Sequence, residues 1–505
     1  ILASILRLYL ITDYPAGLNA DEASLGYNAY SLLETGKDEH GSWWPLAFRS
    51  FDDYKPPLYV YLVLPFIKFL GLTVFAVRLP SALLGIASII LIYFFSNELF
   101  PQKLKLRTGN WELGTGEIAG FLLAISPWHL HFSRGAWEVN IATFFLLLGL
   151  YAFLKALKQQ TWYFLAGFSL VSTLYAYHSM RLIAPLLTLI TLVLYWPEFT
   201  QTLPKSSRYL ISTVIICSLI SIPLVIQTFG GATGSRFSGV SIFADQGPLW
   251  QALEMRNQHP AGLITKILHN RYLSYSLRFT QNYLSHFSPR FIFLLGDEIA
   301  RSKVPDIAQS YLFLFPFVFL GLLKLFHHWG RGEKLILSWL LLAPIPAALT
   351  FQSPHALRAQ NMVIPLTIIT ALGVYFLLQQ AKKVLPLVLT IFLLVSGYNL
   401  ANYLHLYYDH YPQELPYAWQ YGFEELATYL RPKLDQYDQI IISDRYDQPY
   451  ILLAFFLKYD PAKLQNELIF SDRDNFGFST GRAFGNFKFH RINWDKDSQN
   501  QNSLV

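Results

Sequence analysis

The sequence predicts an all-α, polytopic membrane protein with a small mixed domain at its C-terminal end. The 505-residue chain is 53% hydrophobic and only 14% charged, with a mean hydropathy of +0.31. Soluble domains contain about 25% charged residues. The aromatic share of 16% fits side chains that anchor at membrane interfaces. The single cysteine, Cys217, excludes a disulfide framework and a thiolate metal cluster.

The membrane spans are predicted from the length of the apolar runs. The first run is short and the numbering begins at Ile1, so we expect residue 1 to lie inside the first transmembrane helix. About 20 apolar residues span a bilayer, and eleven runs are predicted to do so. They are residues 1–12, 79–99, 117–132, 139–157, 161–177, 182–197, 209–229, 309–327, 334–351, 361–380 and 384–403.

Basic residues decide the position of the apolar stretch 57–72, which begins with two prolines and contains Lys68. If this stretch lies at the outer interface, a basic cluster falls at every alternate boundary, as the positive-inside rule expects. If it crosses the membrane, those clusters lie outside. We therefore predict a transmembrane domain over 1–404 with outer loops at 13–78 and 230–308. The predicted inner residues are Lys103, Lys105, Arg107, Lys155, Lys158, Lys205, Arg208, Lys324, Arg331, Lys334, Lys382 and Lys383.

The tail 405–505 differs in character from the rest of the chain. Its charge density rises, and the segment DQIIISDRYDQPYILLAFFLKYDPAK alternates a β-rich run with a helical one. This pattern predicts a small extracytoplasmic α/β domain. In the long outer loop, residues 261–287 place leucines among basic residues and predict an amphipathic, interfacial helix. Arg236 in the same loop is expected to be a solvated charge.

The first outer loop holds the acidic pair Asp21 and Glu22. Transfer of a group to a hydroxyl needs a base to take the proton, and a carboxylate near a low-dielectric boundary has a raised pKa that suits this role. The alternative is that the aspartate caps a helix beginning at Ala23. Both roles are compatible, so both carboxylates are candidate catalytic groups.

Lys55 lies in the same loop, directly before Pro56 and Pro57. The prolines fix the backbone, which would hold the ammonium group against a phosphate. The alternative is an interface lysine that snorkels to lipid headgroups. Asp52 and Asp53 could orient this lysine, bind a divalent ion or be solvated.

A second polar stretch, residues 126–140, ends one predicted span and begins the next. Arg134 is suited to bidentate phosphate binding, and Glu138 is another outer carboxylate. His129 and His131 are two residues apart and would lie on different faces of a helix, so they are expected to pack and form hydrogen bonds.

Two further stretches place ionisable groups at the outer membrane edge. Residues 175–185 contain His178 and Arg181, and residues 353–361 contain His355 and Arg358. Ionisable groups at such an edge are candidate functional residues. Carboxylates and at least four cations on one face, beside lipid, fit an anionic lipid headgroup that is held while a bond to its phosphate breaks.

These motifs together resemble glycosyltransferase family 39, a group of GT-C bacterial membrane enzymes related to protein O-mannosyltransferases and the aminoarabinose transferases of lipid A. The resemblance covers most of residues 18–365, in the order of the family. The segments that carry it are DEASLGYNAYSLLETGKDEHG, YKPPLY, AVRLPSALLG, SPWHLHFSRGAWEVNIATF, YAYHSMRLIAPLL and PHALRAQNMVIPL.

The resemblance implies a GT-C fold, a polyprenyl-phosphate sugar donor and inversion at the anomeric carbon. Asp21 takes the place of the catalytic aspartate of the first loop, and Lys55 matches the lysine that contacts the donor phosphate. Arg134 matches a family arginine, and Glu138 stands where an aspartate is more usual. The aminoarabinose transferases have a glutamate before this lysine; here Tyr54 occupies that position and Asp53 precedes it, which leaves a metal or acceptor role open.

We therefore expect a glycosyltransferase of the bacterial inner membrane with its active site on the periplasmic side. A protein, lipid or glycan hydroxyl would be the acceptor, and no nucleic acid would bind. Lys55 and Arg134, with Arg181 and Arg358, would stabilise the phosphate charge, and a divalent cation is left open. The alternatives are a lipid-linked sugar flippase, an O-antigen-type ligase with a pyrophosphate-linked donor, and a structural receptor. A flippase should show a polar path across the membrane, whereas the predicted clusters lie on one side.

Overall fold

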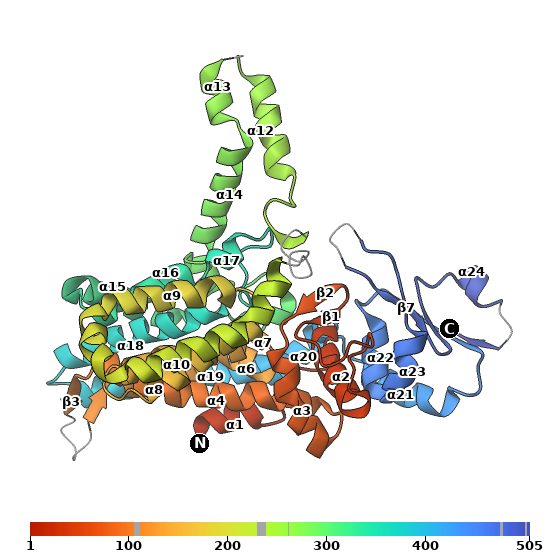
Figure 1. Ribbon diagram of the computed structural model, residues 1–505, viewed down its shortest axis with the longest axis horizontal. Coiled ribbons are helices and arrows are strands. Elements are labelled where there is room, and N and C mark those ends of the chain that lie inside the picture. Colours follow the sequence, from red (N-terminus) through yellow and green to blue (C-terminus); the bar gives the residue numbers. More distant parts are fainter. Residues whose placement is uncertain (106–111, 230–238, 261, 475–477, 500–501) are drawn as a thin grey trace.

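The computed structural model describes residues 1–105, 112–229, 239–260, 262–474, 478–499 and 502–505. Arg107 and Arg236 lie outside these described residues. Helices lie side by side in a bundle, and a mixed region of helices and strands lies beyond one end of it (Figure 1). The first residues of the chain lie in the bundle, and the C-terminal residues lie in the mixed region.

The bundle is held by long apolar helices, chiefly α7 on α8, α15 on α18 and α4 on α5. Its helices are α1 (Leu2–Leu8), α2 (Ala20–Thr35), α3 (Leu58–Leu70), α4 (Val74–Leu99), α5 (Thr115–Ile125), α6 (Pro127–Arg134), α7 (Glu138–Ala156), α8 (Trp162–Ala176), α9 (Met180–Leu194), α10 (Trp196–Phe229), α15 (Phe315–His328), α16 (Arg331–Leu342), α17 (Ile345–Ala348), α18 (Val363–Gln380) and α19 (Leu385–His405).

Helices α15 and α18 approach each other closely because each has a glycine at the contact. A Cβ atom at Gly373 would lie 1.9 Å from the carbonyl oxygen of Phe317, and one at Gly321 would lie 1.9 Å from that of Ile369. Small residues at such contacts allow the backbones of apolar helices to pack directly. A larger residue at either position would force these two helices apart.

Each predicted span coincides with a helix or with consecutive helices. Among the described residues, five helices are long and apolar enough to cross a membrane, or six if a pair bent by 80° counts as one span. The chain is therefore a multi-pass membrane protein, and the count of eleven spans stays a prediction. The predicted run 117–132 is divided between α5 and α6, because Ser126 caps a new helix that starts with Pro127.

The two ends of the bundle carry different hairpins. Strands β3 (Lys103–Lys105) and β4 (Glu112–Gly114) pair at one end, where the sequence predicts the inner face. Strands β1 (Phe48–Ser50) and β2 (Asp53–Lys55) pair at the opposite end, beside the C-terminal region (Figure 1). The bundle thus separates the basic hairpin from the first loop, and the side of the membrane on which each lies stays a prediction.

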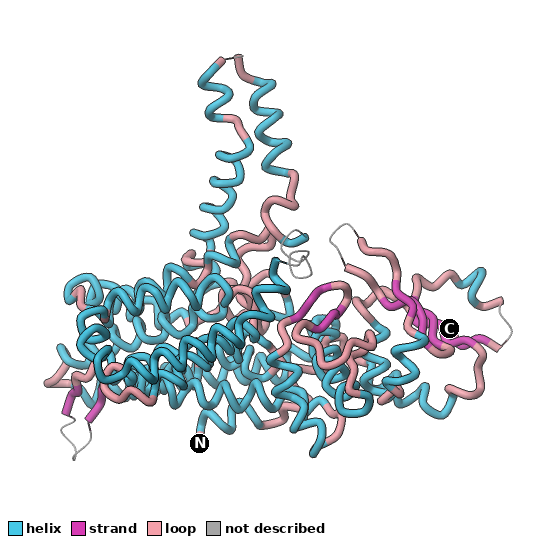
Figure 2. The backbone as a smooth tube through the Cα atoms, in the orientation of Figure 1, coloured by secondary structure: helices cyan, strands magenta, loops and turns pink. Residues whose placement is uncertain are grey.

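A helical arm projects from the bundle, roughly perpendicular to its long helices (Figure 2). It contains α12 (Gly247–Gln258), α13 (Leu263–Leu268) and α14 (Arg271–Ser285). The predicted helix 261–287 is thus broken, because the side chain of Asn270 accepts hydrogen bonds from the backbone N–H groups of Tyr272 and Leu273 and starts a new helix. Its position at the membrane interface stays a prediction.

The C-terminal region contains a mixed sheet in the order β6-β7-β8-β5-β9 within the described residues. Strand β5 is parallel to β8 and β9, while β6, β7 and β8 are antiparallel. The helical segment Leu385–Glu414 is continuous, so the predicted boundary at 404–405 falls inside it. The elements are α20 (Tyr411–Glu414), α21 (Phe423–Leu430), β5 (Gln439–Ile442), α22 (Pro449–Leu457), α23 (Pro461–Glu467), β6 (Ile469–Phe470), β7 (Gly481–Phe484), β8 (Phe487–Phe489), α24 (Trp494–Asp497) and β9 (Ser503–Leu504).

The C-terminal region packs on the first loop. Helix α22 lies against α2, and the hydroxyl of Tyr450 donates a hydrogen bond of 3.1 Å to the buried carboxyl of Glu39. The backbone N–H of Ser479 donates to the carbonyl of Phe51 in the turn between β1 and β2. The tail is therefore one wall of the region that holds the candidate catalytic residues.

Candidate active site

Helix α2 begins one residue before Asp21 and is capped by Asn19. The Asn19 side chain accepts a hydrogen bond from the backbone N–H of Glu22, and the Glu22 carboxylate accepts one from the N–H of Asn19. This reciprocal arrangement is a capping box. The alternative in which Asp21 caps a helix from Ala23 is therefore wrong, and the Asp21 side chain is left for contacts outside the helix.

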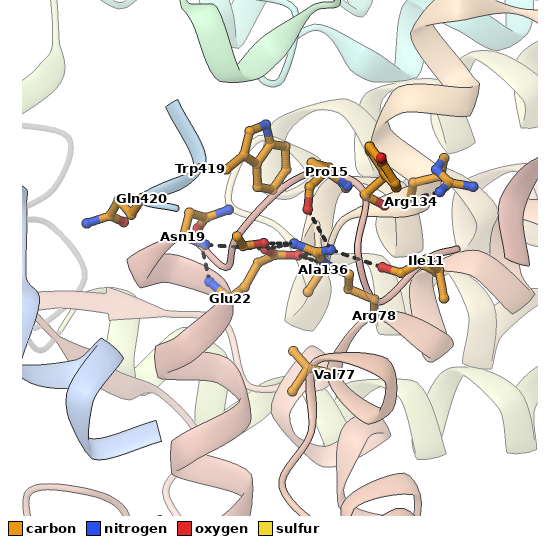
Figure 3. A network of polar contacts seen from close by, with 12 residues as sticks. Ile11, Pro15, Asn19, Glu22, Val77, Arg78, Arg134, Ala136, Trp419 and Gln420 are labelled. Carbon is orange, nitrogen blue, oxygen red and sulfur yellow. Dashed lines mark hydrogen bonds and ion pairs between the residues drawn. The ribbon is translucent and has the colours of Figure 1, made fainter. Parts of the chain in front are cut away.

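Glu22 is fully buried and its two carboxylate oxygens are occupied (Figure 3). Its Oε1 atom accepts hydrogen bonds from the Nε of Arg78 at 3.0 Å and from the backbone N–H of Ala136 at 2.7 Å. Its Oε2 atom accepts from another nitrogen of Arg78 at 3.0 Å. A buried ion pair of this kind is costly to break from one side. Glu22 thus joins α2, α4 and the segment before α7, and its catalytic role stays a prediction.

Arg134 is also buried, and it holds the backbone of the chain's first turns. Its guanidinium donates to the carbonyl oxygens of Leu6, Tyr9 and Tyr14 at 2.8, 2.8 and 3.1 Å, and to the hydroxyl of Tyr407 at 3.0 Å. These bonds use all three nitrogens. The donors of Arg134 are thus engaged inside the fold, and its phosphate role stays a prediction.

Asp21 instead forms ion pairs with two cations from distant parts of the chain. Its Oδ1 atom lies 2.7 Å from the Nζ of Lys55, and its Oδ2 atom lies 3.4 Å from a terminal nitrogen of Arg301. The Lys55 side chain is 5% exposed, while those of Asp21 and Arg301 are 33% and 41% exposed. The carboxylate thus lies at an opening, between a buried cation and an accessible one.

Sequence analysis missed Arg301, which lies in the long outer loop. Its backbone carbonyl lies 2.8 Å from the Nε2 of His131, and its guanidinium stacks over the ring of Trp137 at 6.0 Å. The expectation that His131 forms hydrogen bonds is confirmed. Nothing in the local sequence around Arg301 distinguishes it from a solvated loop arginine.

The β1–β2 hairpin holds Lys55 in place. Its turn residues Phe51 and Asp52 have φ angles of 57° and 62°, which are strained for a residue with a bulky side chain. The contact from Ser479 to the Phe51 carbonyl supports this turn, and the Lys55 ammonium lies 5.2 Å from the Phe51 ring. The hairpin is also tied to the bundle, because the Nε2 of His178 lies 3.0 Å from the carbonyl oxygen of Tyr54.

The aspartates of this hairpin have structural surroundings. Asp52 pairs with Arg49 at 2.6 Å and with Arg473 of the tail at 3.2 Å. Burial acts to raise the pKa of Asp52, but the hydrogen bonds from Arg473 and Arg49 outweigh it and hold the pKa below its ordinary value. Asp53 is buried at the start of β2, where it pairs in register with Ser50. That these aspartates orient Lys55 stays a prediction.

The tail adds a carboxylate that sequence analysis also missed. Reduced solvation and the negative charge of Asp21 raise the pKa of Asp447, while the cations of Arg301 and Lys55 oppose this shift. Gln420 links the start of α2 to the tail: its Oε1 accepts from the backbone N–H of Ala20 at 2.7 Å, and its Nε2 donates to the backbone carbonyl of Asp447. Asp21 therefore pairs with both cations, and its charge is close enough to act on the pKa of a second acid.

Two predicted arginines meet in a neighbouring pocket of about 350 Å³. Arg181 and Arg358 line it together with His178, and the Arg358 guanidinium donates to the hydroxyl of Thr350 at 2.7 Å. The buried Nε of Arg181 has no hydrogen-bond partner among the described residues. The apolar lining is Leu182, Val240, Pro346 and Leu349. The pocket thus combines an apolar wall with two cations.

The other predicted supporting residues lie elsewhere. His355 is buried with its Nδ1 3.5 Å from the carboxylate of Asp297. Burial lowers the pKa of His355 to about 4 although Asp297 opposes this, so the ring is neutral near pH 7. Glu138 is half-buried at the first position of α7, two residues after the Ala136 N–H that binds Glu22.

The residues around Asp21 do not form a metal site. No group of three or more histidine, cysteine, aspartate or glutamate side chains in the described part of the chain could hold a metal ion. Asp21 is flanked by Lys55 and Arg301, which repel a metal cation. The donor set therefore does not fit the divalent ion that the sequence left open.

The fold is similar to that of solved oligosaccharyltransferase and ArnT structures, in agreement with the fold that the resemblance implies. The oligosaccharyltransferase of Archaeoglobus fulgidus, crystallised with Zn and sulfate, matches with a TM-score of 0.54 at 14% identity. The match covers 90% of this chain and 60% of that one. ArnT from Cupriavidus metallidurans in the apo state matches with a TM-score of 0.52 at 11% identity, over 90% and 83% of the two chains. At these identities the likeness is one of fold.

A sequence match points the same way. YycA of Bacillus subtilis (strain 168), provisionally described as a mannosyltransferase, is 24% identical over 199 residues. The match covers 39% of this chain and 27% of YycA, so the chain aligns with about a quarter of that relative's length. No protein-family model matches the chain.

Proposed function

We propose that this protein is a membrane glycosyltransferase that moves a sugar from a polyprenyl-phosphate donor to a hydroxyl acceptor. One observation carries the proposal: an accessible carboxylate, Asp21, is paired with Lys55 and Arg301, and His178, which contacts the residue before Lys55, lines an apolar pocket with two arginines. A structure of ArnT bound to undecaprenyl phosphate has the same fold, with a TM-score of 0.50 at 11% identity.

The donor's phosphate is proposed to bind the cations that Asp21 now engages. Lys55 and Arg301 would contact its oxygens, and Arg181 and Arg358 would hold the charge from the pocket, whose apolar wall suits the prenyl chain. Fixed cations at the place where charge develops are an efficient source of transition-state stabilisation. Because phosphate competes with Asp21 for Lys55 and Arg301, donor binding would leave the carboxylate a stronger proton acceptor.

The proposed reaction is a direct displacement. Asp21 takes the proton of the acceptor hydroxyl, and the acceptor oxygen forms a bond to the anomeric carbon. The bond from that carbon to the phosphate oxygen breaks, and its electron pair leaves with polyprenyl phosphate. A single displacement inverts the anomeric carbon. The reaction is proposed to take place on the periplasmic face of a bacterial inner membrane, as the distribution of basic residues predicts.

A protein acceptor is one of the proposed acceptor classes. A fold neighbour, the Archaeoglobus fulgidus oligosaccharyltransferase tethered with an acceptor peptide containing the NVT sequon, has a TM-score of 0.51 at 13% identity. The tail forms one side of the site through Gln420 and Asp447, so an acceptor that reaches Asp21 passes next to the tail. We propose that the tail contributes to acceptor recognition.

The test is release of polyprenyl phosphate from a synthetic polyprenyl-phosphate mannose by the full chain in detergent, with a panel of peptide, lipid and glycan acceptors. We expect release by the intact chain and none by Asp21→Asn. Release only from a pyrophosphate-linked donor would replace this proposal with the ligase alternative. Transbilayer movement of the donor in proteoliposomes without any release would replace it with the flippase.

A further inference from the structure

Helix α19 ends at His405 and continues into a short π-helix, Leu406–His410, which is followed by α20. A cluster of two histidines and two carboxylates spans this junction. The Nδ1 of His405 lies 2.7 Å from the Oδ2 of Asp409, and the Nδ1 of His410 lies 2.8 Å from the Oε1 of Glu414. The two Nε2 atoms face each other at 3.3 Å. None of these four residues belongs to the candidate active site.

The π-helix is what brings the histidines together. In an α-helix of 3.6 residues per turn, side chains five residues apart point about 140° away from each other. In a π-helix the repeat is i to i+5, so His405 and His410 lie on one face. Single π-turns within helices occur frequently at functional sites. The backbone distortion therefore has a direct result, which is the convergence of two imidazole rings.

The hydrogen bonds fix which nitrogens carry protons. An ionised carboxylate can only accept hydrogen bonds, so both Nδ1 atoms must be donors towards Asp409 and Glu414. In the neutral rings both Nε2 atoms are then bare acceptors. Two lone pairs that face each other at 3.3 Å repel unless a cation lies between them. That cation is either a proton or a metal ion.

The geometry points to a metal ion, and we propose that His405 and His410 bind a divalent transition metal such as Zn²⁺. Zinc–imidazole bonds of about 2.0–2.1 Å at a tetrahedral angle place the two nitrogens about 3.3 Å apart, which is the observed separation. The rings are nearly perpendicular, at 83°. Imidazole is a preferred ligand of Zn, Cu and Ni, and a carboxylate behind each metal-binding histidine is the usual support for such a ligand.

The proposed site is a two-histidine surface site. The side chains of His405 and His410 are 59% and 43% exposed, so water can complete the coordination shell. This arrangement is smaller than the groups of three or more ligands that are absent from the described residues. Tyr411, the residue after His410, donates a hydrogen bond of 2.8 Å to the carbonyl oxygen of Ala300. A metal ion bound at His410 would therefore stabilise the connection between α19 and the tail.

The test is Zn²⁺ binding to the full chain in detergent, purified without a polyhistidine tag, stripped with a chelator and titrated against a chromophoric competitor. We expect one equivalent to bind, a loss of at least tenfold in affinity with His410→Gln, and a loss of about tenfold with Asp409→Asn, as for other residues that support a metal ligand. Co²⁺ should give the absorption of a tetrahedral ion in the intact chain only.

The matched control is the double variant His327→Gln/His328→Gln, which removes another exposed histidine pair with ring centroids 5.1 Å apart. This pair lies on consecutive residues of α15 and cannot chelate one ion from a helix, so binding should be unchanged. Thermal unfolding must first show that His410→Gln is folded. Equal Zn²⁺ affinity in this variant and in the intact chain would then overturn the proposal and leave a shared proton between the rings.

Discussion

The Nζ atom of Lys55 lies 2.7 Å from the Oδ1 atom of Asp21, across 34 residues of sequence. This contact joins the first turn of α2 to the last residue of β2. With Arg301 on the other carboxylate oxygen, Asp21 engages the two cations that a donor phosphate would require. Under the proposed function, donor binding would therefore also activate the proposed base.

Lys55→Gln should weaken binding of polyprenyl phosphate about 10- to 100-fold, because one charge-assisted hydrogen bond is worth about 1.5–3 kcal/mol. Asp21→Asn should bind polyprenyl phosphate at least as tightly as the intact chain, because it removes the competitor for Lys55. Both affinities can be measured by titration in detergent. Weaker binding to Asp21→Asn would show that the carboxylate and the phosphate do not share these cations.

Arg134→Lys should lower stability and leave donor binding unchanged. Lysine keeps the charge but cannot reproduce the planar set of donors that reaches the carbonyls of Leu6, Tyr9 and Tyr14. Each carbonyl left unpaired costs about 1–3 kcal/mol, so the thermal unfolding temperature should fall. The control is Arg208→Lys on the exposed face of α10. A stable Arg134→Lys variant with a much higher KM for the donor would restore the phosphate role that the resemblance implied.

The contrast between Lys55 and Arg134 shows what the sequence could predict. Apolar runs predicted where the helices lie, because burial in a bilayer imposes both length and composition. Loop position and motif order predicted that Asp21 and Lys55 act together, and the structure places them in contact. A buried arginine, however, satisfies its donors equally well with phosphate or with backbone carbonyls. Its partners depend on packing, which the residue type does not encode.

The positions of Arg301 and Asp447 near Asp21 could not be predicted either, and the reason is different. Each reaches Asp21 or its surroundings through docking of a distant segment: the long outer loop through His131, and the tail through Gln420. Such contacts are set by tertiary arrangement, and a single sequence carries no signal for them. The helix breaks at Ser126 and Asn270 could in principle have been predicted from the sequence, because both are capping residues.

The contribution of Glu39 to stability should fall as pH rises from about 4.5 to about 7. Burial raises the pKa of Glu39 to about 7 from an ordinary value of 4.5, although hydrogen bonds from Asn28 and Tyr450 oppose this. The folded chain thus keeps a proton that the unfolded chain releases, and it loses stability on the order of 3 kcal/mol across this interval. Buried histidines such as His355, whose pKa is lowered, contribute a slope of the opposite sign. The slope of Glu39 is therefore measured as the difference between the intact chain and a Glu39 variant in thermal unfolding at pH 5 and pH 8.

Glu39→Gln should remove most of that slope, because its amide does not titrate and the Tyr450 hydroxyl can either donate or accept. The control is Glu34→Gln, an exposed carboxylate at the end of α2, which should keep the slope. If Glu39→Gln were as pH-sensitive as the intact chain, the titrating group would lie elsewhere.

Cysteine labelling should place the first loop and the β3–β4 hairpin on opposite sides of the membrane. In a Cys217→Ser background, Glu34→Cys should react with an impermeant maleimide in intact spheroplasts, while Lys103→Cys should react only after permeabilisation. The two positions are separated by α3 and α4, so labelling of both from outside would mean that residues 57–72 cross the membrane. That result would contradict the eleven-span arrangement.

The central claim, that Asp21 is the base of a sugar transfer, is tested most directly by transfer from polyprenyl-phosphate mannose in detergent. The comparison is between the intact chain, Asp21→Asn and Glu34→Gln, which neutralises a carboxylate on the same helix. We predict transfer by the intact chain and Glu34→Gln, and a rate at least about 100-fold lower for Asp21→Asn, the usual range for loss of a general base. Undiminished transfer by a folded Asp21→Asn variant would contradict the account.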